Sequence, residues 1–141
     1  MIVLLDTDHI SILQWEDEPA ILLRRRLDLL PEDAIRLSIV SFQEQTRGWL
    51  AYLHRARKRQ ELLKGYADLQ YLLSYYHAHE VFPFSELAMD EFESLQQQRI
   101  RIGTKDLRIA AIAKVNGAKL LSRNLRDFQQ VPGLDVEDWT I

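Results

Sequence analysis

The sequence predicts an α/β fold with a central, mostly parallel sheet flanked by helices. Short apolar runs that are typical of buried strands alternate with longer segments of helical periodicity. The turns between them are short, as in βα units, whose crossovers make successive strands parallel. The chain of 141 residues contains no repeat or low-complexity tract, so we expect one domain over residues 1–141.

The first elements follow from apolar runs and from the residues that bound them. Residues 2–5 are apolar without alternation, as in a strand buried on both faces. Asp8 is expected to cap a short helix behind this strand. Residues 16–31 should form a helix, because acids and a proline stand at its start and a proline marks its end. Residues 34–40 are the second predicted strand.

The segment of residues 41–79 is helical in character and long enough for a hairpin of two helices, with a break expected at or shortly before Gly65. Apolar residues in its second half follow the spacing of three and four that is typical of a buried helix face. These residues are Leu62, Leu63, Tyr66, Leu69, Leu72 and Leu73.

The last third of the chain repeats the alternation of strand and helix. Pro83 closes a short strand, Ser85 opens the helix behind it, and Gly117 stops the next helix. The expected strands are residues 80–84, 118–122 and 134–139, and the expected helices are 85–99, 104–116 and one or two turns within 124–131.

Composition excludes several classes of function. The absence of cysteine rules out disulfides, zinc–thiolate sites and cysteine nucleophiles. Strand-like sequence follows Met1 directly, without the pattern of a secretory signal, and no apolar run approaches the roughly 20 residues of a membrane span. We therefore expect a cytoplasmic protein that has no contact with a membrane.

Charge is unevenly distributed. The net charge is −3, yet no acid lies between Glu44 and Glu61. A stretch of this kind is either a solvated helix face or a surface for nucleic-acid phosphates. Its basic residues include Arg47, Arg55, Arg57, Lys58 and Arg59.

Four carboxylates stand at strand ends or helix starts, namely Asp6, Glu44, Asp106 and Asp127. Each has a structural explanation: a turn at Asp6, a capping box of Ser41 with Glu44, helix-dipole compensation by Asp106, and a surface position for Asp127. In a parallel sheet, however, strand ends and the following helix starts meet at one edge, where ligands bind.

Carboxylates brought together at such an edge raise each other's pKa, and a bound cation removes this penalty. Oxygen ligands suit Mg²⁺, or Mn²⁺ as the alternative ion. The pattern therefore predicts a metal site and, with it, a substrate that contains phosphate.

Three stretches resemble PIN-domain proteins of the VapC toxin type: "LLDTDHIS", "SIVSFQEQTRG" and "IGTKDLRIAAIAKVNGAKLLSRNLRDFQQVPGLDVEDW". They occur in the family's order and span nearly the whole chain, apart from a variable helical region between about residues 49 and 80. The resemblance implies the PIN-like three-layer fold, in which a mostly parallel sheet lies between helices.

By this resemblance Asp6, Glu44 and Asp106 match the positions that hold Mg²⁺ in the family, with Asp6 and Asp106 as the most direct ligands. Where many PIN domains have a fourth acid, this chain has Asn124, and Asp127 follows one turn later. The fourth position is therefore filled by Asn124 or by Asp127 through water. Supporting roles are implied for Ser122 and Asp8.

The resemblance also implies hydrolysis of RNA phosphodiesters by water. Backbone contacts would come from the basic stretch at Arg47, Arg55, Arg57, Lys58 and Arg59, with Lys105 beside the third acid. Members of the family are toxins that pair with a small antitoxin and often form homodimers, so both partners are expected here.

Two other interpretations stay open. "DTD" after an apolar strand is similar to the start of haloacid-dehalogenase-type phosphatases, although Ile10 stands where that family has threonine or valine. Alternatively, Asn124 marks a degenerate PIN domain that binds RNA or protein without cleavage.

Overall fold

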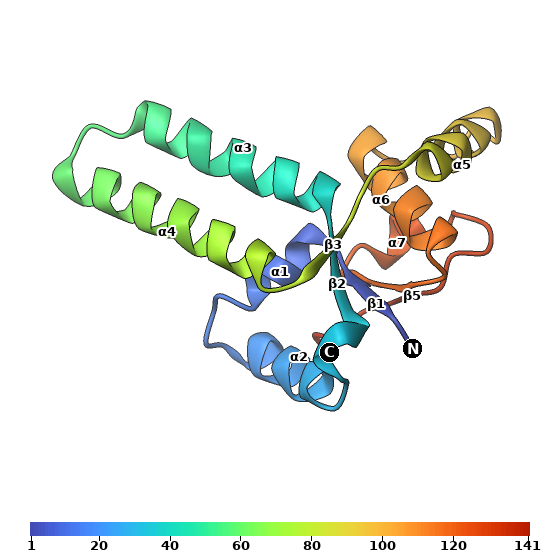
Figure 1. Ribbon diagram of the computed structural model, residues 1–141, viewed down its shortest axis with the longest axis horizontal. Coiled ribbons are helices and arrows are strands. Elements are labelled where there is room, and N and C mark those ends of the chain that lie inside the picture. Colours follow the sequence, from blue (N-terminus) through green and yellow to red (C-terminus); the bar gives the residue numbers. More distant parts are fainter.

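The computed structural model describes all 141 residues and has a five-stranded parallel sheet at its centre (Figure 1). The strand order is β3-β2-β1-β4-β5, and every neighbouring pair is parallel. The predicted fold class is thus confirmed. The strands are β1 Val3–Leu5, β2 Ile35–Ser38, β3 Glu80–Phe82, β4 Lys119–Leu121 and β5 Val136–Glu137.

Helices cover both faces of the sheet, which makes three layers (Figure 1). Leu4 of β1 packs in one core with α5, α6 and α7, whereas Val3 and Leu5 pack in the other with α1, α2 and α4. The full burial of these three leucine and valine side chains explains why the first strand is apolar without alternation. The helices are α1 Thr7–Ile12, α2 Glu18–Asp28, α3 Ile39–Arg55, α4 Arg59–His77, α5 Glu86–Gln97, α6 Thr104–Val115 and α7 Leu125–Phe128, with a 3-10 turn at Glu32–Ala34.

The hairpin of α3 and α4 extends away from the sheet (Figure 1), and its break lies at residues 56–58 rather than near Gly65. Gly65 lies inside α4, where it is buried against α3. A Cβ at this position would lie 2.4 Å from Cδ2 of Leu53. Gly65 therefore allows close approach of the two helices and does not break the segment.

The buried face predicted for α4 is largely wrong. Leu62, Leu63, Tyr66 and Leu73 are all exposed, and Leu72 is the one fully buried member of the predicted set. The physical reason is the projection of the hairpin beyond the sheet, so that no further layer covers its outer side. Apolar spacing alone cannot distinguish a face that packs within the chain from one left on the surface.

The second strand is shorter than predicted, because Ile39 and Val40 already belong to α3. Ser38 ends β2 and caps α3, since its Oγ accepts a hydrogen bond from the Ser41 amide at 3.0 Å. The other strands and helices lie within their predicted ranges, with ends shifted by a few residues. None of the helices is both long enough and apolar enough to cross a membrane.

Candidate active site

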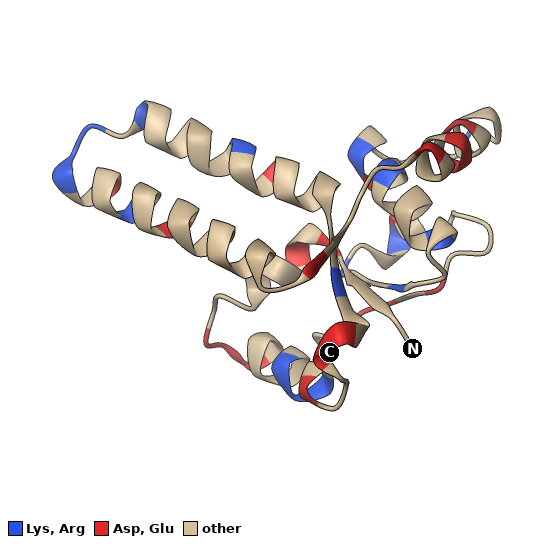
Figure 2. Ribbon diagram, viewed as in Figure 1, with Lys and Arg blue, Asp and Glu red and all other residues tan.

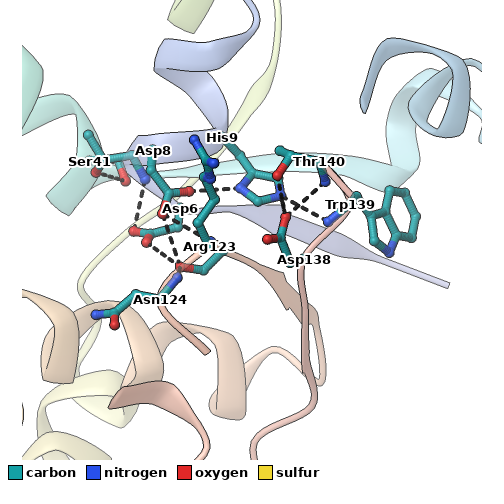
Figure 3. Close-up of polar contacts among 11 residues, drawn as sticks. Asp6, Asp8, His9, Ser41, Arg123, Asn124, Asp138, Trp139 and Thr140 are labelled. Carbon is teal, nitrogen blue, oxygen red and sulfur yellow. Dashed lines mark hydrogen bonds and ion pairs between the residues drawn. The ribbon is translucent and has the colours of Figure 1, made fainter. Parts of the chain in front are cut away.

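The carboxyl ends of β1 and β4 and the N-terminal turns of the neighbouring helices meet at one edge of the sheet. Asp6 follows β1, Glu44 lies in the second turn of α3, Asp106 lies in the first turn of α6, and Ser122 follows β4. Figure 3 shows the part of this edge that surrounds Asp6 and Asp8. Residues more than 100 positions apart in the sequence are joined here by hydrogen bonds, such as that between Ser122 and Asp6.

Asp6 is a buried carboxylate with only 6% of its surface exposed. Its Oδ1 accepts from the Thr7 amide at 2.8 Å, which caps α1, and its Oδ2 accepts from Ser122 Oγ at 2.8 Å. Burial raises the pKa of Asp6 to about 7; the charges of Asp8 and Asp106 add to this rise, and the two hydrogen bonds oppose it. Asp6 is thus kept at a place where its charge is unfavourable without a cation.

Asp8 lies in the first turn of α1, and the prediction that it caps this helix is wrong because Asp6 occupies the capping position. Its Oδ2 accepts from the Arg123 amide at 3.0 Å and lies 3.3 Å from Ser122 Oγ. Its Oδ1 lies 2.7 Å from Nδ1 of His9 (Figure 3). The carboxylate therefore ties the start of α1 to the turn after β4.

Asn124 joins the two remaining acids. Its Nδ2 donates to Oδ2 of Asp127 at 3.0 Å and to Oδ2 of Asp106 at 3.3 Å. Because carboxylates only accept, the amide nitrogen must face them, and Asn124 acts here as a donor. Burial and the charges of Glu44 and Asp127 raise the pKa of Asp106, while the hydrogen bond from Asn124 lowers it.

Glu44 is held by Thr7, whose Oγ1 donates to Oε1 of Glu44 at 2.9 Å and lies 3.0 Å from Oγ of Ser41. The capping-box interpretation of Ser41 and Glu44 is wrong, because Ser38 caps α3 and Glu44 points instead to the start of α1. Its position opposite the strand ends is therefore not explained by helix capping.

The donor set fits a hard divalent cation that keeps part of its water shell. No three His, Cys, Asp or Glu side chains are arranged to hold a metal ion by themselves. Mg²⁺ commonly binds through one or two carboxylates and retains several waters, so it does not need a closed protein cage. Asp6 and Asp106 have raised pKa values and are coupled by charge, as expected for a pair that a dication would stabilise.

Comparison with known proteins gives one consistent result over the full chain. Ribonuclease VapC1 of Haemophilus influenzae strain R2866 is 27% identical over 143 residues, which cover 99% of both chains. Ribonuclease VapC1 of Rickettsia felis is 42% identical over 57 residues, or 40% of each chain. No protein-family model matches.

The solved structures agree. VapBC-1 from nontypeable Haemophilus influenzae has a TM-score of 0.73 at 26% identity and covers all of both chains. DNA-bound VapBC from Salmonella typhimurium has a TM-score of 0.77 at 22% identity, covering 99% of this chain and 98% of that one. Over its full length the chain is thus similar to VapC ribonucleases, and its fold is that of the VapBC toxin structures. This similarity favours the PIN interpretation over the phosphatase interpretation.

The basic residues singled out in the sequence lie in two different places. Arg55, Arg57, Lys58 and Arg59 lie at the tip of the α3–α4 hairpin, away from the strand ends, as Figure 2 shows. Arg55 lies 11 positions after Glu44 along α3, a rise of about 16 Å. Arg47 lies nearer the sheet on α3, and Lys105 is the neighbour of Asp106 on α6.

Three polar residues of the site escaped the sequence prediction: Thr7, Ser41 and His9. Thr7 and Ser41 bond across two elements, and His9 is fully buried beside Asp8. In the sequence, Thr7 and His9 are marked only by their position, because they alternate with the two acids in "DTDH". A hydroxyl or imidazole next to such acids can orient them through hydrogen bonds.

Proposed function

We propose that this protein is a metal-dependent endoribonuclease, the toxin of a type II toxin–antitoxin pair, with residues 1–141 acting as one PIN-like domain. The observation that carries the proposal is the meeting of Asp6, Glu44 and Asp106 at one sheet edge, with the pKa of both aspartates raised. The names of the full-length relatives as VapC ribonucleases support it.

Asp6 and Asp106 would be the direct ligands of Mg²⁺ or Mn²⁺, with Glu44 beside them and Asp127 acting through water. The bound ion would lower the pKa of a water molecule and neutralise charge that develops on the phosphate. Asn124 keeps Asp127 next to Asp106 through its two hydrogen bonds. Ser122 orients Asp6 through its hydrogen bond to Oδ2.

Glu44 is the candidate for orienting the attacking water. Thr7 fixes one of its oxygens at 2.9 Å, so that the other can accept a hydrogen bond from water. No residue of the site requires a covalent intermediate or the 2′-hydroxyl of the substrate. The expected product ends are therefore a 5′-phosphate and a 3′-hydroxyl, and 2′,3′-cyclic phosphate ends would contradict this mechanism.

The proposed partners are RNA as substrate, a small antitoxin and a second copy of the chain. The structural neighbours are VapBC complexes, which supports the antitoxin. The exposed apolar side chains of α4, with exposures of 59% at Leu63, 62% at Tyr66 and 58% at Leu73, would suit a protein partner. RNA phosphates next to the acids would be bound by Lys105 and Arg47, and those of a longer RNA by the basic residues of the hairpin tip.

The test is cleavage of total RNA by the purified protein, freed of any antitoxin, in Mg²⁺, Mn²⁺ or EDTA. Asp6→Asn and Asp106→Asn would be compared with Asp90→Asn, a control on the exposed surface of α5. We expect discrete products with metal, none in EDTA, and loss of cleavage in the two site variants alone. A folded protein that binds RNA and never cuts it would support the degenerate PIN domain instead.

A further inference from the structure

His9 connects the C-terminal segment to the acids of the site. It lies on α1 with no exposed surface. On one side Nδ1 lies 2.7 Å from Oδ1 of Asp8, and on the other Nε2 lies 3.2 Å from the backbone nitrogen of Trp139 (Figure 3). Both ring nitrogens are thus used, and neither faces solvent.

These two contacts determine the tautomer of the ring. The backbone N–H of Trp139 can only donate, so Nε2 of His9 must accept and carries no hydrogen. The ring proton then sits on Nδ1 and is donated to Asp8. Asp138 does not compete, because it lies 3.7 Å from Nε2 and its Oδ1 already accepts from the amide and hydroxyl of Thr140 at 2.8 and 2.6 Å.

Asp8 needs this donor in order to keep its place. Its other oxygen is bound by the Arg123 amide at 3.0 Å, and Ser122 Oγ has one hydrogen, which the shorter contact assigns to Asp6. Without His9, the Oδ1 atom of Asp8 would have no partner within the chain. The carboxylate could then turn away from the Ser122–Arg123 turn that orients Asp6.

We propose that His9 is a positioning residue of the metal site, which holds Asp8, and through Asp8 the Ser122–Arg123 turn, in the arrangement that makes Asp6 a cation ligand. Ligand geometry in metal sites depends on such outer hydrogen bonds, and their loss typically lowers metal affinity by about 10- to 100-fold. The inference rests on the proposed function only in treating Asp6 as a ligand.

Two substitutions separate the two contacts of His9. The amide nitrogen of His9→Asn lies near the place of Nδ1 and can donate to Asp8, but it does not reach Trp139. The side-chain oxygen of His9→Gln reaches the place of Nε2 and can accept from Trp139, but it provides no donor for Asp8. A purely structural role predicts similar effects of both, since each variant loses one buried hydrogen bond.

The experiment is a titration of the metal-free, antitoxin-free chain with Mn²⁺ by calorimetry, with thermal unfolding measured in EDTA. We expect His9→Gln to bind Mn²⁺ at least about 10-fold more weakly than the unmodified chain, and His9→Asn to remain within about 3-fold. Both variants should lose thermal stability in EDTA. Equal weakening of Mn²⁺ binding in both, or in neither, would overturn the proposal.

A double variant provides the second test. If His9 acts through Asp8, the weakening caused by His9→Gln should disappear once Asp8 is replaced, so adding His9→Gln to Asp8→Asn should change Mn²⁺ affinity less than about 2-fold, and a larger change would contradict the route. Because binding is measured without RNA, a chain that binds Mn²⁺ but cuts nothing overturns the proposed function and leaves this inference standing. A chain that binds no Mn²⁺ overturns the inference.

Discussion

The side-chain amide of Asn124 donates a hydrogen bond to Asp127 at 3.0 Å, and the same nitrogen lies 3.3 Å from Asp106. A neutral donor thus stands between two carboxylates at the point where many PIN domains have an acid. In the metal-free protein this donor reduces the repulsion between the two acids. The departure from the family pattern therefore has a structural role and does not by itself indicate a degenerate site.

Asn124→Asp should make the metal-free protein less stable and more dependent on metal. The change replaces a donor by a third anion, and we expect unfolding in EDTA to become easier by about 1–3 kcal/mol. Added Mn²⁺ should restore more stability to the variant than to the unmodified chain. Thermal unfolding in EDTA and in Mn²⁺ measures the loss of stability and its recovery, with Asn124→Ala as the uncharged control. A variant as stable as Asn124→Ala in EDTA would contradict this role.

The raised pKa of Asp6 predicts a pH dependence of stability. Its pKa is about 7 in the folded, metal-free chain against an ordinary value of 3.8, so the folded state holds a proton that the unfolded chain has lost. The stabilisation that protonated Asp6 provides is fully present below about pH 4 and is lost as the pH rises through 7. Over this range the free energy of unfolding should fall by up to about 1.4 kcal/mol per pH unit. Asp6→Asn should remove this slope.

Denaturant unfolding in EDTA between pH 5 and 8 measures the effect, and an equal slope in both proteins would exclude Asp6 as its source. Metal binding should change in the opposite sense. A proton on Asp6 competes with the cation, so Mn²⁺ affinity should rise with pH through 7.

The sequence allowed prediction of the sheet and of most helices, because strand ends, caps and prolines are local signals. Ser85 caps α5 as expected, and Gly117 has the left-handed φ of 59° that ends α6. The failures have a common cause in tertiary context. The apolar spacing of α4 predicted a buried face, yet the projecting hairpin leaves most of that face exposed. A glycine at position 65 suggested a helix break, but Gly65 instead allows close packing of α3 against α4.

In the candidate site, too, local signals could be predicted from the sequence and tertiary contacts could not. The acids could be selected because strand ends in a parallel sheet converge. The hydrogen bonds that orient them could not, since Thr7 to Glu44 and Ser122 to Asp6 depend on side-chain directions after folding. The capping box of Ser41 and Glu44 failed for this reason: it was consistent in sequence, but Ser38 occupies the capping position.

Lys105 should contribute more to binding near the acids than the hairpin tip. Lys105 adjoins Asp106, whereas Arg57, Lys58 and Arg59 lie at the far end of the hairpin (Figure 2). Binding of a short RNA oligonucleotide to the Asp6→Asn chain, measured over a range of salt concentrations, tests this. Lys105→Ala should lower the salt slope by about 1, and the triple alanine variant of the tip should leave it unchanged. A larger loss at the tip would show that RNA binds along the hairpin.

The packing of the hairpin predicts opposite effects for two Gly→Ala substitutions. A Cβ at Gly65 would lie 2.4 and 2.9 Å from Cδ2 and Cγ of Leu53, so the helices must separate or Leu53 must move. Overpacking of this kind costs about 1–3 kcal/mol, more than the roughly 1 kcal/mol that alanine adds to a helix. At Gly48 of α3 nothing lies within 4 Å of the added carbon, so Gly48→Ala should stabilise by up to about 1 kcal/mol.

Denaturant unfolding compares the two substitutions, with Leu53→Ala added to Gly65→Ala to relieve the contact. Equal stabilisation by both substitutions would show that Gly65 is not needed for the approach of α3 and α4.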